Sequence, residues 1–418
     1  MPIRFSCPAC DKSLKAPDGF AGEQLPCPGC ETSVTVPQKS QRSRSRTATP
    51  NPRRRRPSEE TESKSSHRPD GGASKPSKKK SRRSQSTGQY RLLVGALVVS
   101  LLPLIYVTVL PGRSAEERFE QTAQQNPNVF AELEAWIESE ETSGEFDLFT
   151  RLPDQRLSGA HLSRTSWMHW LYALLSTGVF LGMILILTPR AEASVGGLLT
   201  AGLVTGTVGI VLLLGFQWVA DATQGFMFTG HSIITVLFYI VKFIGFSYRS
   251  AVQEGNGFLL SFMGFTCGVG LCEELCKAIP VVLFLQSTPN ASWRAALAIG
   301  LASGVGFGVS EGIAYSSDFY NGVSTGSIYV VRFVSCVGLH AMWAGAVALL
   351  MQANHDHMEL SWDSVWQFVV FYLGIAMILH GLYDTLLKQE LNLGALAIAG
   401  LSIGWLYWLI NQRRATDE

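Results

Sequence analysis

Long apolar stretches separated by short polar segments occupy residues 91–411, whereas residues 1–90 are polar and basic. A helix needs about 20 apolar residues to cross the hydrocarbon core of a bilayer. We therefore predict an all-α polytopic membrane protein with about eight or nine transmembrane helices. The predicted spans are residues 92–111, 167–187, 196–220, 232–246, 257–286, 295–316, 327–351, 365–387 and 391–410.

Two cysteine pairs mark the polar N-terminal head. Cys7 and Cys10 form one C-x2-C pair, and Cys27 and Cys30 form a second one sixteen residues later. This spacing is typical of four thiolates around tetrahedral zinc. A piece of about 35 residues buries too little core to fold alone, so zinc would supply its folding energy. We predict a structural zinc ribbon with β-prone pieces such as residues 33–36. A redox pair is the weaker alternative, because no βαβ pattern surrounds the cysteines.

The linker that follows, residues 38–90, is rich in Ser, Arg, Lys and Pro and contains basic runs at 53–56 and 78–83. Few apolar residues and no periodicity predict a disordered basic linker. The linker ends beside the first predicted span, which favours contact with anionic lipid headgroups over binding to nucleic acid. Its charge places the N-terminus in the cytoplasm, in a multi-pass protein of the plasma membrane. No cleavable signal peptide is expected.

Loop charges agree with this orientation in the first half of the chain but less well in the second. Nine crossings would put Arg413 and Arg414 outside the cell, which the positive-inside rule disfavours. One candidate is therefore expected to be re-entrant or interfacial, and the short segment 232–246, which carries Lys242, is the first suspect. The expected parts are a zinc-ribbon head (1–37), the linker (38–90), a first transmembrane helix (91–111), an extracytoplasmic segment (112–165) with a helix at 128–140, a membrane core (166–411) and a tail (412–418).

Ionisable side chains inside the apolar segments are the strongest signal of chemistry. Glu273, Glu274 and Lys277 lie within the predicted span 257–286. A charged side chain at the centre of a bilayer costs about 3 kcal/mol on insertion scales. Glu273 and Lys277 are four residues apart and can pair on one helix face, while Glu274 points about 100° away. One carboxylate can thus be held by the cation and the other can remain free as a base; the alternative is an ion-paired helix contact.

Three later spans carry further ionisable groups. Glu311 lies in a glycine-rich stretch, His340 lies mid-span, and His380 and Asp384 are four residues apart on one helix face. Asp384 can therefore orient the imidazole. The glycines leave a helix face that allows close helix approach; they are Gly304, Gly306, Gly308 and Gly312. We expect the acids and histidines to converge on one buried site, as a metal-ligand set or an acid/base set distributed over a bundle.

These motifs resemble those of the PrsW family of membrane-embedded proteases. Glu273-Glu-Leu-Cys-Lys277 is similar to its EExxK motif and Phe307-Gly-Val-Ser-Glu311 to its FxxxE motif. The segments that start at His340 and His380 are similar to its two histidine motifs. The resemblance covers roughly residues 165–411, and the family is related to the CAAX-protease and bacteriocin-processing group. In that group an Arg stands one position further on than Lys277, and a His stands in place of Glu311.

The resemblance implies an intramembrane endopeptidase that cleaves membrane-anchored proteins, with a regulatory protein such as an anti-sigma factor as one substrate class. Glu274 or Glu273 would take a proton from water. His340 and His380 would bind a metal or polarise the carbonyl, and Glu311 would be a ligand or a second acid. Zinc or another divalent metal is the implied cofactor at this site. A proton-coupled transporter and a non-catalytic membrane sensor with a zinc-ribbon head are the alternatives.

Overall fold

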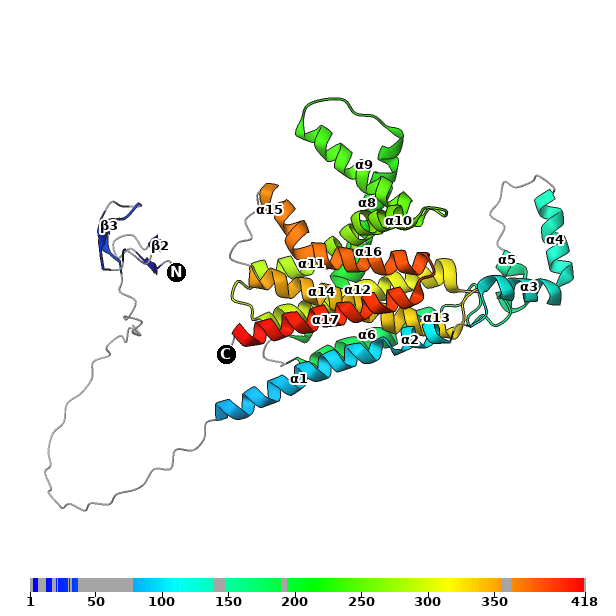
Figure 1. Ribbon diagram of the computed structural model, residues 1–418, viewed down its shortest axis with the longest axis horizontal. Coiled ribbons are helices and arrows are strands. Elements are labelled where there is room, and N and C mark those ends of the chain that lie inside the picture. The colour runs from blue at the N-terminus through cyan, green and yellow to red at the C-terminus, as the bar shows by residue number, and fades with distance from the viewer. Residues whose placement is uncertain are drawn as a thin grey trace, which may run out of the picture. The chain divides into compact units, whose positions relative to one another are not determined.

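The computed structural model of the chain describes residues 3–6, 13–16, 20, 22–28, 30, 32–36, 78–110, 112–138, 148–188, 194–354 and 362–416. The chain forms two units, Met1–Ser74 and Lys75–Glu418. Short strands make up the first unit and helices make up the second, as Figure 1 shows.

The first unit contains two antiparallel hairpins. Strand β1 (Ile3–Ser6) pairs with β2 (Ser13–Ala16), and β3 (Gln24–Pro26) pairs with β4 (Ser33–Thr35). Cys27 directly follows β3 and is buried next to Val34. The strand β4 falls where the sequence pattern predicts a β-prone piece. Cys7, Cys10 and residues 37–77 lie outside the described residues, so zinc ligation by four cysteines and a disordered linker stay predictions.

The second unit consists of helices and connecting loops in the part of the chain that the structure describes. Its elements are α1 (Lys78–Ser100), α2 (Leu102–Val109), α3 (Ala115–Gln125), α4 (Pro127–Glu138), α5 (Leu148–Arg151), η2 (Pro153–Gln155), α6 (Met168–Leu187), α7 (Val195–Val204), η3 (Thr205–Gly209), α8 (Ile210–Ala222), η4 (Thr223–Gly225), α9 (Ile233–Val252), α10 (Phe258–Gly264), η5 (Phe265–Gly270), α11 (Leu271–Ser287), α12 (Trp293–Tyr315), η6 (Ser316–Tyr320), α13 (Gly326–Val330), η7 (Val331–Cys336), α14 (Val337–Ala353), α15 (Trp362–Gln367), η9 (Phe368–Leu373), α16 (Gly374–Lys388) and α17 (Asn392–Thr416).

Eight helices within the described residues are long and apolar enough to cross a membrane, which confirms the predicted class of multi-pass membrane protein. The predicted span 257–286 is not among these eight, although α10, η5 and α11 follow one another without a break. Its three charged residues, Glu273, Glu274 and Lys277, explain the difference. The first helix also begins earlier than hydropathy indicates, because α1 starts at Lys78, inside the predicted disordered linker. Lys and Arg are good helix formers, so an apolar helix can extend into a basic segment at little cost.

Helices α12 and α14 form the centre of the bundle. They pack antiparallel, since Gly300 faces Ala344 and Gly308 faces Val337. A side chain at Gly304 would overlap the backbone of His340. The glycine-rich stretch therefore does allow close helix approach, as its sequence predicts.

Both ends of the membrane unit lie at the same end of this bundle. Tyr90, near the start of the first span, packs on Trp293 with ring centroids 5.1 Å apart. Arg413 donates a 3.4 Å hydrogen bond to the carbonyl oxygen of Leu349, near the end of α14. Nine full crossings would put Arg413 and Arg414 at the opposite end from the basic N-terminal segment, so this arrangement agrees with the expectation that one candidate does not make a full crossing.

The helix pair α8–α9 explains why both ends of the unit lie at one end of the bundle although the sequence contains nine apolar segments. It projects from the bundle at the top of Figure 1, and Gln224 at its turn donates a 2.8 Å bond to the carbonyl oxygen of Lys242. At the other end of α9, Lys388 donates 2.7 Å bonds to the carbonyl oxygens of Ala251 and Gln253. Helices α7 to α9 thus make one net passage between the ends of the bundle. The suspected segment 232–246 belongs to the 20-residue helix α9, so its predicted shortness is also corrected.

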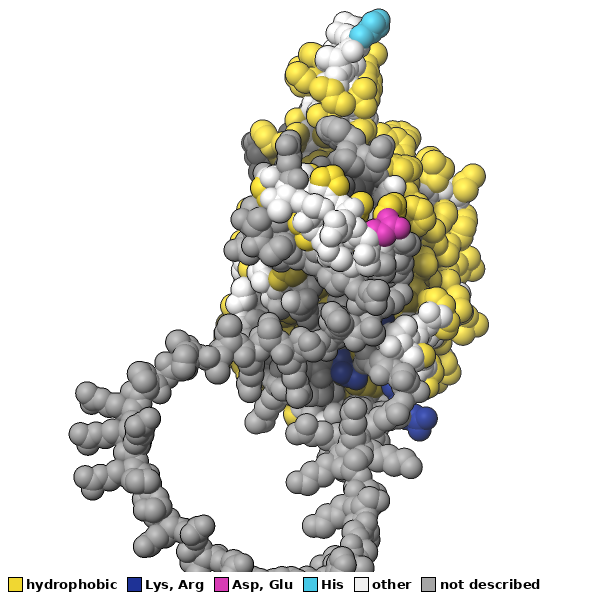
Figure 2. Space-filling view, turned by 90° about the vertical axis from the view of Figure 1, so that its left-hand side faces the viewer, with side chains coloured by type: hydrophobic (Ala, Val, Ile, Leu, Met, Phe, Trp, Pro, Cys, Tyr) yellow, Lys and Arg dark blue, Asp and Glu magenta, His cyan; other side chains and the backbone are white. Residues whose placement is uncertain are grey.

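Lipid-facing side chains dominate this projecting pair. Ile233, Ile234, Phe243 and Phe246 of α9 are exposed. Figure 2 shows hydrophobic side chains over the part that projects at the top. An exposed apolar surface of this kind is expected of a helix pair that faces hydrocarbon, because lipid covers it at no cost.

Residues 112–138 and 148–165 form a small helical layer against the segment between α12 and α13. The predicted helix at 128–140 corresponds to α4 (Pro127–Glu138), and a capping box of Ser114 and Glu117 starts α3. Arg118 of α3 donates to the carbonyl oxygen of Val323, and the backbone N–H of Leu157 donates to Gly322 at 2.8 Å. These contacts agree with a packed cap over the membrane core.

Several of the long helices contain a π-helical segment just before the residues of interest. Segment η5 precedes Glu273 on α11, η7 precedes His340 on α14, and η9 precedes His380 on α16. A π-helical turn adds a residue to the helix and so rotates the face that follows it. Such segments are frequent at functional sites.

Candidate active site

Helix α11 brings the three charged residues of the first motif into the protein interior. The Lys277 ammonium lies 2.7 Å from Glu274 Oε1 and 3.7 Å from Glu273 Oε2, and all three side chains are buried. The sequence indicated that Lys277 can pair with Glu273 and left open which carboxylate the cation holds. The shorter contact is instead to Glu274, because residues three apart are also neighbours on a helix face.

Pro280 lies inside α11, about one helical turn after Lys277. Proline has no N–H, so the turn before it lacks one hydrogen-bond donor. Ser303 of α12 donates a 2.7 Å hydrogen bond to the carbonyl oxygen of Lys277. Thr205 in turn lies 2.7 Å from Ser303, hydroxyl to hydroxyl. The charged turn of α11 is therefore anchored to two neighbouring helices.

His380 of α16 lies between the carboxylates of α11 and Asp384. Its Nδ1 is 3.1 Å from Glu274 Oε1, and its Nε2 is 3.6 Å from Glu273 Oε2. The same Nε2 lies 3.3 Å from Asp384 Oδ2, one helical turn away. Asp384 is thus placed where it can orient the imidazole, as the i,i+4 spacing predicts.

His340 of α14 joins α11 to α12. Its Nδ1 lies 2.9 Å from Lys277 Nζ, and its Nε2 lies 2.7 Å from Glu311 Oε2. Because an ammonium group can only donate, Nδ1 accepts from Lys277, while Nε2 faces the Glu311 carboxylate. Gly308 leaves the space beside this ring, since a side chain there would meet the imidazole.

An arginine that sequence reasoning missed completes the group. Arg332 of η7 is buried, and its Nη2 lies 2.6 Å from Glu311 Oε1. The criterion that identified the other residues would have found it, because Arg332 is an ionisable residue inside the predicted span 327–351.

Aromatic rings enclose the polar groups. Trp343 stacks on His380 with ring centroids 4.6 Å apart, and its Nε1–H donates to Ser402 at 2.9 Å. The Lys277 ammonium lies 4.7 Å from the ring centroid of Phe307. These rings limit the movement of both charged and imidazole groups.

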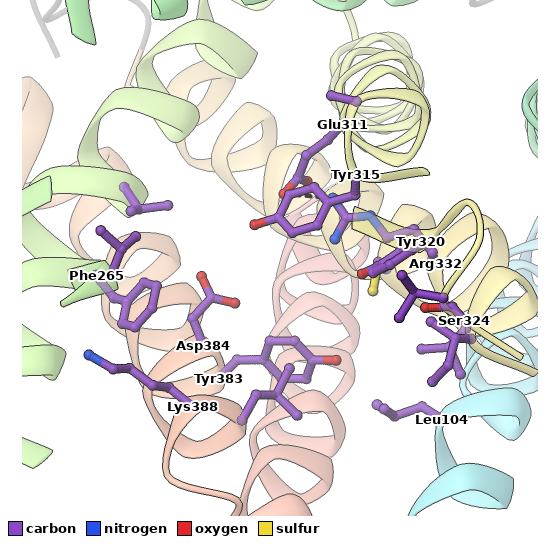
Figure 3. Close-up of a pocket in the computed structure, with 18 of the residues that line it drawn as sticks. Leu104, Phe265, Glu311, Tyr315, Tyr320, Ser324, Arg332, Tyr383, Asp384 and Lys388 are labelled. Carbon is purple, nitrogen blue, oxygen red and sulfur yellow. Dashed lines mark ion pairs between the residues drawn. The ribbon is translucent and has the colours of Figure 1, made fainter. Parts of the chain in front are cut away.

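A cavity of about 1170 Å³ opens beside this cluster. Some residues of the cluster line the cavity and others do not. Glu273, Glu311, Asp384 and Arg332 line it. Figure 3 shows Glu311 and Arg332 on one wall and Asp384 on another. Glu274 does not line this cavity and is held by Lys277. Of the two adjacent carboxylates, the one that faces open space is therefore Glu273.

Three of the buried groups could hold a metal ion. One ligand atom from each of Glu273, His340 and His380 lies within 4.8 Å of the others. Two imidazoles and one carboxylate form a donor set that suits a catalytic zinc ion. Glu273 Oε2 is buried without a hydrogen-bond partner among the described residues, as expected of an atom that awaits a ligand. Glu311, named from sequence as a possible ligand, is not in this group, and Glu273 is.

The structure therefore brings together all seven residues that the sequence predicted for the membrane site. They come from α11, α12, α14 and α16 and are Glu273, Glu274, Lys277, Glu311, His340, His380 and Asp384. Carboxylates, imidazoles and a candidate metal position beside a cavity within a membrane bundle are features of membrane-embedded hydrolases.

Residues 222–410 match the model of the PrsW family intramembrane metalloproteases. The match includes every residue of the cluster, supports the family resemblance seen in the motifs, and supports a peptidase. The zinc-ribbon head, the linker, and helices α1 to α8 except Ala222 lie outside the matched range. No curated protein and no solved structure was found to match the chain.

Proposed function

We propose that the protein is an intramembrane endopeptidase that cleaves membrane-anchored proteins at the cluster on α11, α12, α14 and α16. The observation that carries this proposal is the convergence of four apolar helices on one group of acids and histidines beside a cavity. Isolated charges in a bilayer are costly, so such a concentration indicates function. The family match to residues 222–410 supports the same reaction class and favours neither the transporter nor the sensor.

Glu273, His340 and His380 would hold a divalent metal ion such as zinc. Each histidine would present one unprotonated ring nitrogen to the metal and give up the contact that this nitrogen makes now. A metal bound there would act as a Lewis acid on the scissile carbonyl and would acidify a bound water. The neighbouring groups orient these ligands: Asp384 and Glu274 lie on either side of His380, and Glu311 lies 2.7 Å from His340 Nε2. Lys277 offsets the negative charge of Glu274.

Glu311 is our candidate for the proton acceptor. It lines the cavity and lies outside the metal-binding group. In the proposed reaction Glu311 takes a proton from water while the water oxygen attacks the carbonyl carbon, and the C=O electron pair moves to the carbonyl oxygen. The oxyanion then collapses, the C–N bond breaks, and Glu311 returns the proton to the leaving amine. Sequence reasoning named Glu274 or Glu273 as the base and Glu311 as a ligand or second acid. In this proposal Glu274 would instead position His380, and Glu273 would hold the metal.

The parts of the chain outside the cluster would help to place the protein at the membrane and next to its substrate. The resemblance suggests a regulatory membrane protein as one substrate class. Cysteines 7, 10, 27 and 30 would bind a structural zinc, and the basic linker would contact anionic lipid headgroups. Arg413 and Arg414 lie at the same end of the bundle as Tyr90, which supports a cytoplasmic position for both termini of a plasma-membrane protein.

The test is cleavage by the purified full chain in liposomes that contain single-span reporter proteins, with products identified by mass spectrometry. The wild type should cut at least one reporter within or next to its span. Glu311→Gln keeps the shape of the side chain but cannot accept the proton, and it should lose cleavage by about 100-fold or more while still binding metal. Unchanged cleavage by single variants of Glu273, Glu311, His340 and His380 would contradict the proposal.

A further inference from the structure

Arg332 presents a buried cation to the cavity, and neither the motifs nor the metal-binding group includes it. Its side chain lines the cavity next to Glu311. The guanidinium also lies 4.4 Å from the ring centroid of Tyr315, which packs against one of its faces. Figure 3 shows Glu311, Tyr315 and Arg332 gathered on the same wall. The arginine is thus fixed in place by an anion and by an aromatic ring.

The hydrogen-bonding capacity of Arg332 exceeds what the protein supplies. A guanidinium has five N–H donors. Its charged partner is Glu311, with which it forms an ion pair. The Nε atom has no hydrogen-bond partner in the described part of the chain, although the residue is only 9% exposed. Leaving a buried donor unsatisfied costs about 1–3 kcal/mol, and more when it is charged. Such a donor at a cavity wall indicates a ligand.

The charges around Arg332 select the kind of ligand. The cavity wall carries both signs of charge: Glu273, Glu311 and Asp384 line it, and so do Arg113, Arg118, Arg249 and Lys388. An uncharged group that offers a hydrogen-bond acceptor therefore fits beside Arg332, whose nearest charged neighbour is already Glu311. A peptide carbonyl is uncharged when it binds and becomes an oxyanion only during the reaction. Donors aimed at such an oxygen stabilise the transition state more than the bound substrate.

We propose that Arg332 is a catalytic residue that donates hydrogen bonds to the carbonyl oxygen of the scissile peptide bond and stabilises the oxyanion formed there. This inference rests on the proposed peptidase function. Its contact with Glu311 places the donor next to the group that takes the proton from water, 2.6 Å away. Proton acceptor and oxyanion donor are then adjacent on α12 and η7.

The experiment compares wild type with Arg332→Met and Arg332→Lys, using a reporter that the wild type cuts. Loss of one oxyanion donor lowers kcat by about 100- to 1000-fold. Arg332→Met should show a loss of this size with KM changed less than about threefold, because the interaction strengthens in the transition state. Arg332→Lys keeps the charge but loses the planar fork, and it should remain at least about tenfold below wild type.

A second measurement separates this role from a purely structural one. A phosphinic peptide built on the reporter's cleavage site imitates the tetrahedral oxyanion. Its Kd should rise in Arg332→Met by about the same factor as kcat/KM falls, while the metal content stays at the wild-type value. Arg151→Met changes an exposed arginine that pairs with Glu132 outside the cavity, and it should behave as wild type.

These measurements distinguish failure of the inference about Arg332 from failure of the proposed peptidase function. If both Arg332 variants cut the reporter at the wild-type rate, or bind the phosphinic peptide as tightly, the inference is wrong and the peptidase proposal stands. If Arg332→Met loses metal, or does not fold and Arg332→Lys is fully active, Arg332 has a structural role only. If the wild type cuts no reporter, the proposed function itself fails.

Discussion

The two central helices and the projecting pair α8–α9 use apolar sequence in opposite ways. The apolar windows of the spans that contain α12 and α14 are 78% and 89% buried, whereas the window of α9 is 22% buried. Glycine and alanine predominate where α12 faces α14, and large aliphatic and aromatic side chains cover α9. Hydropathy alone describes both as membrane helices.

The difference shows what a polar site in a membrane requires. Small residues let α12 and α14 approach closely enough for His340 to sit beside Gly304 and Gly308. Close packing also excludes lipid and holds ionised groups at fixed distances. The pair α8–α9 has no such constraint, and its polar side chains make exposed contacts. Matched substitutions in the two regions should therefore have very different effects.

The largest difference is expected between two ion pairs. Lys277 and Glu274 are 1% and 0% exposed, whereas Arg249 and Asp221 on α8–α9 are 56% and 64% exposed. Removing one partner of a buried pair costs about 3–5 kcal/mol, because the other charge stays buried alone. Lys277→Met should lower the unfolding free energy by this amount. Arg249 and Asp221 line the open cavity, where solvent can screen their charges, so Arg249→Met should change it by less than about 1 kcal/mol.

Denaturant titration in detergent micelles measures both values. Equal stability of the Lys277→Met variant and the wild type would mean that the buried charges are not paired as described.

The next largest difference concerns two glycines. A Cβ at Gly304 would overlap the His340 backbone, which cannot move aside, whereas nothing lies within 4 Å of the same position at Gly215 on α8. Gly304→Ala should cost about 2–3 kcal/mol through overpacking and should also reduce cleavage, because it displaces His340. Gly215→Ala should be neutral or stabilise by up to about 1 kcal/mol. The same titration and reporter assay test both; a neutral Gly304→Ala would show that α12 and α14 are further apart.

A smaller effect is expected from two tryptophans. Trp343 is 1% exposed, stacks on His380 and donates to Ser402, while Trp218 on α8 is 74% exposed. Trp343→Phe removes the hydrogen bond and part of the stacking, a loss of about 1.4 kcal/mol that would reduce cleavage about tenfold by loosening His380. Trp218→Phe should leave the rate unchanged. Rate measurements on both variants check this, and equal rates would remove Trp343 from the support of the site.

The sequence predicted the membrane class and the residues of the cluster because both depend on local rules. A charge inside an apolar run is conspicuous, and spacings of three and four residues place side chains on one helix face. Which of two adjacent carboxylates faces the cavity depends on where His340 and His380 lie, and these belong to other helices. The sequence alone therefore could not show that Glu274 pairs with Lys277 or that Glu273 lines the cavity.

Two features of the fold depend on contacts that a hydrophobic pattern does not reveal. The π-helical segments η5, η7 and η9 rotate the helix faces that follow them, and no residue type marks them. The path of α8–α9 away from the bundle changes the number of passages between its ends, so the hydrophobic pattern alone did not settle the end at which Arg413 lies. Lys388, which fixes the end of α9, is separated from Ala251 by 137 residues.

Metal content and cleavage measured on the same sample test the central claim most directly. The full chain with Cys7, Cys10, Cys27 and Cys30 changed to Ser would lack the predicted ribbon zinc, so any metal that remains would belong to the membrane unit. We predict one divalent ion per chain and reporter cleavage in this variant, and the loss of both when His340 and His380 are also changed to Ala. Full cleavage with no metal bound, or with both histidines replaced, would contradict the account.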